Sequence, residues 1–264
     1  MKQATIVMFY GPKPSCLATL IATCQEQVAH ILGNCFHPYD IGQVHATLVS
    51  LEQVPGSAGF NRYFYTYRNQ MRPMDVSGLL NFLRKGGHFP LRVQIGGFQK
   101  KDYPFTSQGQ RPYERSFSIV GVEAAIPLLV GWPVLERSPA SEVSARDMEQ
   151  ESEDYPTTLD KIRRSVQAFN VIHRYHRTPT DIDNDFYFRI GLLHQPFPGY
   201  ELRKKTEGML REHLRTVQPI IVDITAADLS IISYRDETLP LASTQAWQIH
   251  DIKVTPDFIL SLYQ

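Results

Sequence analysis

The chain has 264 residues, of which 42% are hydrophobic and 20% charged, a globular composition with room for one large domain or two small ones. Lys plus Arg and Asp plus Glu number 27 each, so no overall positive field exists; this excludes a DNA duplex as partner and leaves a small nucleotide or an RNA end. The three cysteines form no CxxC pair, so we expect no disulfide framework and a cytoplasmic protein. No window reaches the roughly 18 apolar residues of a membrane span, so we expect no membrane partner.

Strands and helices alternate through the first half of the chain. Residues 5–10 are β-branched and aromatic and are closed by Gly-Pro, which predicts a strand. Ser15 is typical of an N-cap, and apolar residues follow it at helical spacing until Gly33. We expect strands at 5–10, 43–48, 91–95, 117–122 and 128–134, and helices at 15–33 and 75–83.

The segment 43–48 is predicted to be a strand that carries His-x-Thr. Side chains alternate faces along a strand, so His45 and Thr47 point one way while the apolar residues between them point the other. A hydroxyl that donates a hydrogen bond and an imidazole that moves a proton together suit a phosphate. The alternative is a strand with one polar face and no further role.

Two stretches combine basic and aromatic side chains. Residues 57–75 interleave aromatics with arginines, a pattern that suits either stacking of a base beside a phosphate or packing of an insertion on the domain. Residues 99–115 form a polar loop that is either simply solvated or a basic rim beside the site. From this loop we predict Tyr113 and Arg115 as substrate-binding residues.

A second cycle of elements follows residues 136–156, which are polar, mostly acidic and predicted to be a mobile connection. Its strand–helix order is similar to that of the first half. We therefore expect an α+β fold over residues 1–264, a single domain with two lobes at 1–135 and 157–264. Helices are expected at 158–173, 200–214 and 257–263, and strands at 186–193, 220–224, 229–234 and 246–252.

The segment 45–48, His-Ala-Thr-Leu, resembles the first motif of the two-histidine phosphoesterases, the LigT-like superfamily that includes cyclic nucleotide phosphodiesterases and bacterial 2′-5′ RNA ligases. It follows an opening strand and helix, as the resemblance requires, and Gly-Trp-Pro at 131–133 is also similar to the family. The resemblance implies a duplicated α+β fold with antiparallel sheets lining a central groove and helices on the outside. It also implies histidine acid–base chemistry without a metal or an organic cofactor.

The second motif of that family, roughly Phe-His-x-Thr-Leu-Gly, has changed in this chain. Its best match is the segment 186–191, where Tyr187 replaces the histidine and Arg189 replaces the threonine. The resemblance assigns one imidazole as general base and the other as general acid, and both roles need a pKa near neutral. Arg189 cannot be the acid but can clamp a phosphate, and Tyr187, with an ordinary pKa near 10, is a poor proton donor.

Other histidines offer no obvious substitute for the missing one. His194 ends the same predicted strand but falls on the opposite face by parity. His173 falls on the predicted helix 158–173, and we interpret it as a packing residue at the edge of the core. No HExxH or HxH pattern occurs, so we expect no zinc site.

Three hypotheses follow. The first is a phosphoesterase for a 2′,3′-cyclic phosphate or a 2′-5′-linked nucleotide or RNA end, with His45, Thr47 and Tyr187 as catalytic residues and Arg189 binding the phosphate. The second is a relative that has lost catalysis and binds a nucleotide, an RNA end or a protein partner. The third is an α+β protein without chemistry in a groove. We expect a monomer in each case.

Overall fold

The computed structural model of the protein describes residues 2–103, 105–121, 125–135, 156–178 and 180–264. The predicted connection at 136–156 lies outside the described residues except for its last position. The fold is α+β, as the sequence predicts, and every strand pairing in the described chain is antiparallel.

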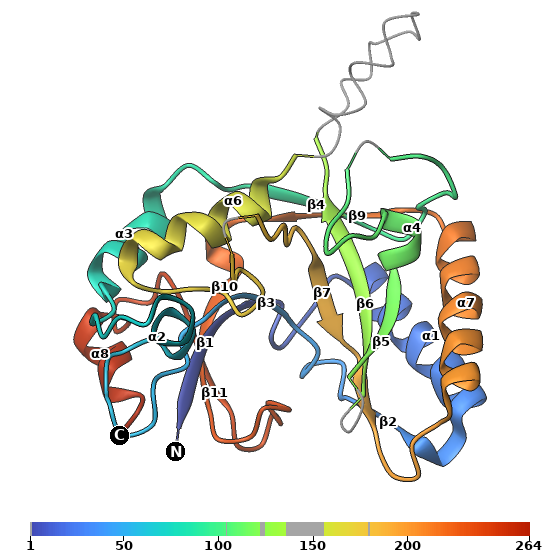
Figure 1. The fold of residues 1–264 in the computed structure, drawn as a ribbon, viewed down its shortest axis with the longest axis horizontal. Coiled ribbons are helices and arrows are strands. Elements are labelled where there is room, and N and C mark those ends of the chain that lie inside the picture. The colour runs from blue at the N-terminus through green and yellow to red at the C-terminus, as the bar shows by residue number, and fades with distance from the viewer. Residues whose placement is uncertain (1, 104, 122–124, 136–155, 179) are drawn as a thin grey trace, which may run out of the picture.

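One long sheet forms the centre of the molecule (Figure 1). Its strands are β1 (Gln3–Met8), β3 (Ala46–Ser50), β4 (Leu91–Ile95), β5 (Phe117–Val120), β6 (Ile126–Pro133), β7 (Phe186–Arg189), β9 (Ile220–Ile224), β10 (Leu229–Tyr234) and β11 (Gln245–Gln248). They are arranged in the order β11-β10-β1-β3-β7-β6-β4-β9, and β5 pairs with β6 off this path. The strands β2 (Phe36–Pro38) and β8 (Gly191–Leu193) form a separate two-stranded sheet.

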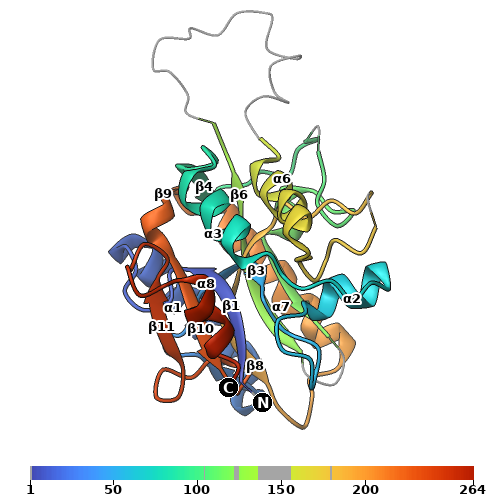
Figure 2. The same cartoon turned by 90° about the vertical axis from the view of Figure 1, so that its left-hand side faces the viewer.

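The helices and one face of the sheet enclose the main hydrophobic core. Alternate strand side chains such as Ile6, Leu48 and Phe188 share this core with the apolar residues of the helices. Helices α1 and α7 pack together at one end of the sheet, and α3 and α8 pack together at the other (Figures 1 and 2). The helices are α1 (Ser15–Leu32), α2 (Arg62–Arg68), α3 (Val76–Lys85), α4 (Pro112–Arg115), α6 (Thr158–Ser165), α7 (Tyr200–Thr216) and α8 (Pro256–Ser261), with the 3-10 turns η1 (Gly33–Cys35), η2 (Val166–Phe169) and η3 (Ala226–Asp228).

The two predicted lobes are interleaved in the sheet. Strands β1 and β3 lie beside β10 and β11, which come from the second half of the chain, whereas β4 and β6 lie beside β7 and β9. The boundaries 1–135 and 157–264 therefore do not divide the sheet. Long-range antiparallel pairing gives the strands partners that hydropathy patterns along the chain cannot identify.

Two predicted elements differ locally from the structure. Ser15 is the first residue of α1 rather than its cap, because Pro14 occupies the N-cap position and makes no side-chain hydrogen bond. The predicted strand 186–193 is interrupted at Ile190, because β8 leaves the main sheet to pair with β2.

The predicted helix 158–173 is shorter than expected. It ends in the 3-10 turn η2, after which Asn170 adopts a left-handed conformation with φ of 58° that stops helical winding. His173 consequently lies in a loop, where it can face a different part of the molecule than a helical residue would.

Within the described ranges, none of the helices combines the length and the apolar character that crossing a bilayer requires.

Candidate active site

A pocket lies over the seam between β3 and β7, at the middle of the sheet. The two strands pair through a single bridge, Ala46 with Phe188, and the described chain shows no further ladder pair between them. The empty volume of the pocket, about 490 Å³, includes the open solvent at its mouth. Its wall combines side chains from β1, β3, β7 and β10 with side chains from α2 and the loop after η2.

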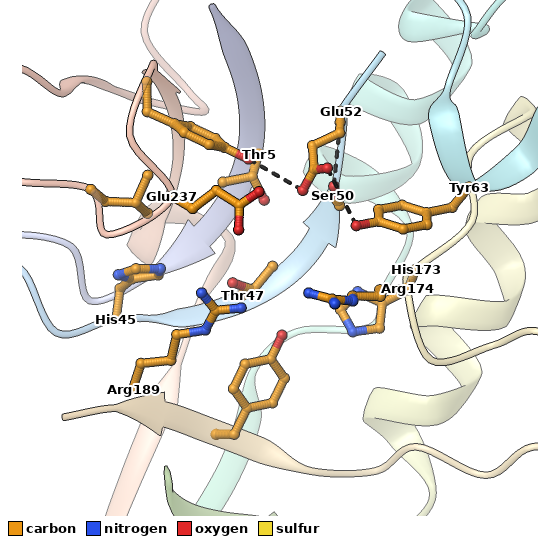
Figure 3. A pocket seen from close by; sticks show the side chains of 13 residues that line it. Thr5, His45, Thr47, Ser50, Glu52, Tyr63, His173, Arg174, Arg189 and Glu237 are labelled. Atoms are coloured by element: carbon orange, nitrogen blue, oxygen red, sulfur yellow. Dashed lines mark hydrogen bonds between the residues drawn. The ribbon is translucent and has the colours of Figure 1, made fainter. Parts of the chain in front are cut away.

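Strand alternation places the predicted site residues together. Thr47 on β3 and His45, which directly precedes β3, line the pocket with Tyr187 and Arg189 on β7, while the intervening apolar residues enter the core. β3 begins at Ala46, three residues later than the predicted strand 43–48. In Figure 3 the Arg189 side chain reaches toward Thr47, and His45 lies beside it. The structure thus brings an imidazole, a hydroxyl and a guanidinium to one space, as parity along the two strands predicts.

His45 has one ring nitrogen fixed and the other left for the pocket. Its Nδ1 lies 2.8 Å from the carbonyl oxygen of Gln43, which can only accept, so Nδ1 carries the proton and donates it. Burial lowers the pKa of His45 to about 4, and the positive charges of Arg189 and Lys13 also lower it. The hydrogen bond to Gln43 has the opposite effect on this pKa. At neutral pH the imidazole is therefore uncharged, with Nε2 as an acceptor.

Lys13 is a second cation near His45 that the sequence analysis missed. Its Nζ donates a hydrogen bond to the Gly11 carbonyl at 3.0 Å. Burial lowers the pKa of Lys13 to about 8, and the charge of Asp40 opposes this shift. The turn after β1 thus adds positive charge to the His45 end of the pocket, where an anionic group would be stabilised.

Tyr187 is protonated throughout the neutral pH range. Burial raises the pKa of Tyr187 to about 12, with Tyr175 adding to the shift and Arg163 and Arg189 opposing it. Its hydroxyl can donate a hydrogen bond to a phosphate oxygen, but it is a weaker acid than an ordinary tyrosine. Among the described residues, His, Cys, Asp and Glu side chains form no group of three that could hold a metal ion.

Arg163, on α6, joins β3 to the segment that leads into β7. It is fully buried, and its guanidinium donates to the carbonyls of Thr47 at 2.8 Å and Leu48 at 3.2 Å. It also donates to the Asp185 carbonyl at 3.0 Å and lies 3.2 Å from a carboxylate oxygen of Asp183. One side chain therefore holds the two site strands where ladder pairing between them stops.

His173 lies in the wall of the pocket and not simply at the edge of the core. It is 1% exposed, and its Nε2 lies 3.3 Å from Oδ2 of Asp183. Burial lowers the pKa of His173 to about 4, and the charge of Arg163 contributes, while Asp183 opposes the shift. In Figure 3 His173 lies on the opposite side of Thr47 from His45, so the two imidazoles are at different ends of the pocket.

The far end of the pocket, beyond Thr47, is assembled around Asn61. This residue is 1% exposed and caps α2 by accepting a hydrogen bond from the backbone of Phe64 at 2.8 Å. Its side-chain nitrogen donates to the Ser50 carbonyl at 3.0 Å, and its oxygen also accepts from the backbone of Ile172 at 3.3 Å. One amide thus connects the end of β3, the start of α2 and the loop that carries His173.

Glu52 occupies this far end and is held by two hydroxyls. Tyr63 and Tyr234 each donate a hydrogen bond to one of its carboxylate oxygens at 3.3 Å, and Arg62 lies 3.6 Å away. Burial and the nearby Glu52 charge raise the pKa of both tyrosines, so these hydroxyls remain donors throughout the neutral range. Sequence patterns gave no sign of this residue, because its partners come from distant parts of the chain.

Arg115 and Tyr113, which the sequence predicts as substrate-binding residues, do not line this pocket. The Arg115 side chain is buried, and its Nε donates to Asp185 at 2.7 Å. The Tyr113 hydroxyl donates to Glu212 on α7 at 2.5 Å. Both side chains are therefore engaged in packing α4 against the domain, because the 99–115 segment folds back rather than extending along the site.

Acidification is expected to destabilise the fold between about pH 6.5 and about pH 4. His45 and His173 have ordinary pKa values of 6.5 that burial lowers to about 4. In that window the unfolded chain binds protons that the folded chain does not, so the free energy of unfolding falls by up to about 3 kcal/mol per histidine as the pH drops from 6.5 to 4, while the neutral rings carry no such penalty above pH 6.5. Urea unfolding at several pH values measures this. Between about pH 6.5 and about pH 4 the free energy of unfolding should fall less steeply with decreasing pH for His45→Gln than for wild type. The same pH dependence in both proteins would contradict the lowered pKa of His45.

Comparisons with known proteins assign no family and no function to the chain. No family model matches the chain, and no curated protein matches it. The crystal structure of TT0787 of Thermus thermophilus is similar over 93% of this chain and 93% of that chain, with a TM-score of 0.37 and 11% sequence identity.

Proposed function

We propose that the chain is a metal-independent phosphoesterase for a 2′,3′-cyclic phosphate or a 2′-5′-linked nucleotide or RNA end. The observation that carries this proposal is the convergence of His45, Thr47 and Arg189 on one pocket. A guanidinium and a hydroxyl bind phosphate oxygens, and an imidazole whose free nitrogen is an acceptor can take a proton from water. The resemblance of residues 45–48 to a phosphoesterase motif points to the same chemistry.

In the proposed reaction His45 is the general base. A water oxygen bonds to phosphorus while the water proton passes to Nε2 of His45, and the bond from phosphorus to the leaving ribose oxygen breaks. Gln43 keeps the ring oriented and stabilises the imidazolium through the Nδ1 hydrogen bond. The negative phosphate opposes the burial and the cationic neighbours that lower the pKa of His45, so the imidazole becomes a stronger base with substrate bound.

Arg189 and Thr47 stabilise the charge that develops on the phosphate oxygens. Arg189 is half-buried on β7, where a bidentate contact with two oxygens would be stronger than in open solvent. The leaving oxygen takes its proton from solvent or, less readily, from Tyr187, because burial raises the pKa of that hydroxyl to about 12. An enzyme with one efficient proton-transfer residue is expected to be slower than one with a matched pair.

The proposal includes a two-lobed, duplicated arrangement in which each lobe combines strands from both halves of the chain and the site lies between the lobes. Its support is the strand order, in which β11-β10-β1-β3 lies on one side of the β3–β7 seam and β7-β6-β4-β9 lies on the other. The two chain segments that meet at the seam each contribute one pair of site residues: His45, directly before β3, with Thr47 on β3, and Tyr187 with Arg189 on β7.

The second candidate function is nucleotide or RNA-end binding without catalysis. It is favoured by the identity of the residues on β7, since Tyr187 and Arg189 bind phosphate well and transfer protons poorly. The two candidates share the same phosphate position, so binding and turnover have to be measured separately.

The test combines hydrolysis with calorimetry on the wild-type protein. Hydrolysis of 2′,3′-cyclic nucleotides and of 2′-5′-linked oligoadenylate is measured with and without a chelator. Turnover that the chelator leaves unchanged supports the phosphoesterase, and turnover that the chelator abolishes contradicts its metal independence. Binding of the product nucleotides without turnover supports the second candidate, and the absence of both excludes the two functions together.

Arg189→Met is expected to weaken nucleotide binding by about 10- to 100-fold, because it removes a charged hydrogen-bond donor from the phosphate. Arg189→Lys keeps the charge but loses the bidentate geometry, so its nucleotide affinity should lie between those of wild type and Arg189→Met. The measurement is isothermal titration with a nucleoside 3′-monophosphate. Arg92→Met is the matched control, since Arg92 pairs with Asp223 on the exterior and outside this pocket. Equal affinities for wild type and Arg189→Met would remove Arg189 from the phosphate site.

A further inference from the structure

The pocket has two chemically different ends. Arg189, Thr47 and His45 make one end suited to an anion, with the exposed carboxylate of Glu237 on its rim. At the other end Glu52 presents a carboxylate, which repels a phosphate and accepts hydrogen bonds from donors. In Figure 3 Glu52 and Tyr63 lie across Thr47 from the His45 end, so a ligand that occupies the whole pocket must carry a phosphate at one end and hydrogen-bond donors at the other.

We infer that the far end of the pocket is a nucleobase subsite that selects guanine. The inference rests on the proposed function, because it takes the ligand to be a nucleotide. Tyr63 borders the same space as Glu52 and donates its hydroxyl to that carboxylate, and an aromatic ring beside a base is a common stacking partner in nucleotide sites. The subsite is defined by Glu52, Tyr63, Arg174 and Tyr234.

Glu52 is oriented before any ligand arrives. The hydroxyls of Tyr63 and Tyr234 bind its two oxygens from different elements, α2 and β10, and Asn61 fixes the start of α2 against the end of β3. A carboxylate has about four lone-pair positions, so each oxygen can accept another hydrogen bond after it has accepted one from a tyrosine. The Glu52 side chain is 16% exposed, which leaves it accessible from the pocket.

Arg174 supplies the donor that completes the pattern. It lines the pocket beside Glu52, and although partial burial disfavours its charge, the neighbouring Tyr175, Tyr63 and Glu52 raise the pKa of Arg174. Its backbone position is held by the Tyr67 hydroxyl, which donates to the Arg174 carbonyl at 2.9 Å. The far end thus offers two carboxylate acceptor atoms beside a guanidinium donor.

Guanine is the base whose edge matches this set. Its Watson–Crick edge presents two adjacent donors, N1–H and the 2-amino group, next to the O6 acceptor. Adenine and cytosine offer one amino donor beside a ring acceptor, and uracil offers a single N–H between two carbonyls. Each of these three bases would place at least one acceptor against the Glu52 carboxylate, which leaves a desolvated polar group without a partner.

The experiment measures base preference by isothermal titration, using the 3′-monophosphates of guanosine, inosine, adenosine, cytidine and uridine. The guanosine nucleotide is expected to bind about 10- to 100-fold more tightly than the adenosine, cytidine and uridine nucleotides. Inosine lacks the 2-amino group and should be intermediate. Equal affinity for all five nucleotides would overturn the inference.

Glu52→Gln tests the proposed contact directly. The amide keeps the shape of the side chain and one acceptor oxygen for the tyrosine hydroxyls, but it turns the second acceptor into a donor. We expect it to remove the preference for guanosine and inosine while the affinities for the other bases change less than about threefold. Tyr63→Phe, which removes one hydroxyl that orients Glu52, should reduce the preference without abolishing it.

Glu237→Gln is the matched control, because Glu237 is an exposed carboxylate on the rim of the same pocket. It should change the affinity for all five nucleotides by the same factor, since it alters only the field felt by the phosphate. If Glu52→Gln also changed all five affinities equally, the base subsite would be excluded while the phosphate site remained. If no nucleotide bound wild type, both this inference and the proposed function would fail.

Discussion

Arg163→Met is expected to lower the free energy of unfolding by about 3–5 kcal/mol, because it leaves a buried carboxylate without its cation. Arg163 is fully buried, lies 3.2 Å from Asp183 and donates to backbone carbonyls of Thr47, Leu48 and Asp185. Burial on its own would raise the pKa of Asp183, but Arg163 and His173 together lower it below its usual range. Without the guanidinium, burial is expected to raise the pKa of Asp183, so its carboxylate becomes costly to keep charged. The backbone carbonyls that Arg163 binds also lose their donor.

Urea unfolding measures this loss, and two further variants identify its cause. Arg163→Met combined with Asp183→Asn should recover part of the stability, because the second change removes the uncompensated charge. Arg92→Met breaks a 2.7 Å ion pair with Asp223 in which the partners are 29% and 52% exposed, and it should cost less than about 1 kcal/mol. A loss for Arg163→Met as small as that for Arg92→Met would mean that the seam is held by other contacts.

His45→Ala is expected to lower kcat for phosphodiester hydrolysis by about 10²- to 10⁴-fold, the usual effect of losing a general base. The wild-type kcat/KM should fall as the pH drops toward the pKa of about 4 that burial gives His45 in the free protein, since only the neutral imidazole can accept a proton. This acid limb should be absent from the residual activity of the variant. Initial rates across a pH series measure both effects.

Two controls separate a chemical role of His45 from a structural one. The affinity of the variant for a nucleoside 3′-monophosphate should stay close to that of wild type, because Arg189 and Thr47 still line the phosphate end. At neutral pH, where the ring is uncharged, the free energy of unfolding should change less than for truncation of a core residue, since the buried ring makes one hydrogen bond, to Gln43, and packs edge-on against Tyr10 at the wall of the pocket. A loss of several kcal/mol in stability, with rates that merely follow the folded fraction, would assign His45 to the core.

Local patterns in the sequence were enough to predict the β3 and β7 parts of the site. Parity along a strand depends only on backbone geometry, so Tyr187 and Arg189 share a face once their segment is assigned as a strand. His45 lies on the same side as Thr47 although β3 begins only at Ala46. Apolar spacing likewise predicted most of the helices, including α1 and α7, because each buries a continuous stripe against the sheet.

The remainder of the site depends on contacts between distant segments. Glu52 owes its orientation to Tyr234, which is far from it in the chain, and no local pattern marks such a pair. His173 was assigned to a helix that Asn170 ends with a left-handed residue, so its predicted surroundings were wrong. Arg115 was interpreted as exposed because a polar loop is usually solvated, whereas its buried partner Asp185 lies on another segment.

The place of β1 in the sheet has a consequence for the order in which the molecule is built. β1 pairs with β3 on one side and with β10 on the other, and β10 is synthesised long after both. The pocket takes Thr5 from β1 and Tyr234 from β10. A growing chain on the ribosome therefore carries His45 and Thr47 for most of its synthesis without a closed pocket around them, and the wall of the pocket is complete only when β10 has emerged and paired.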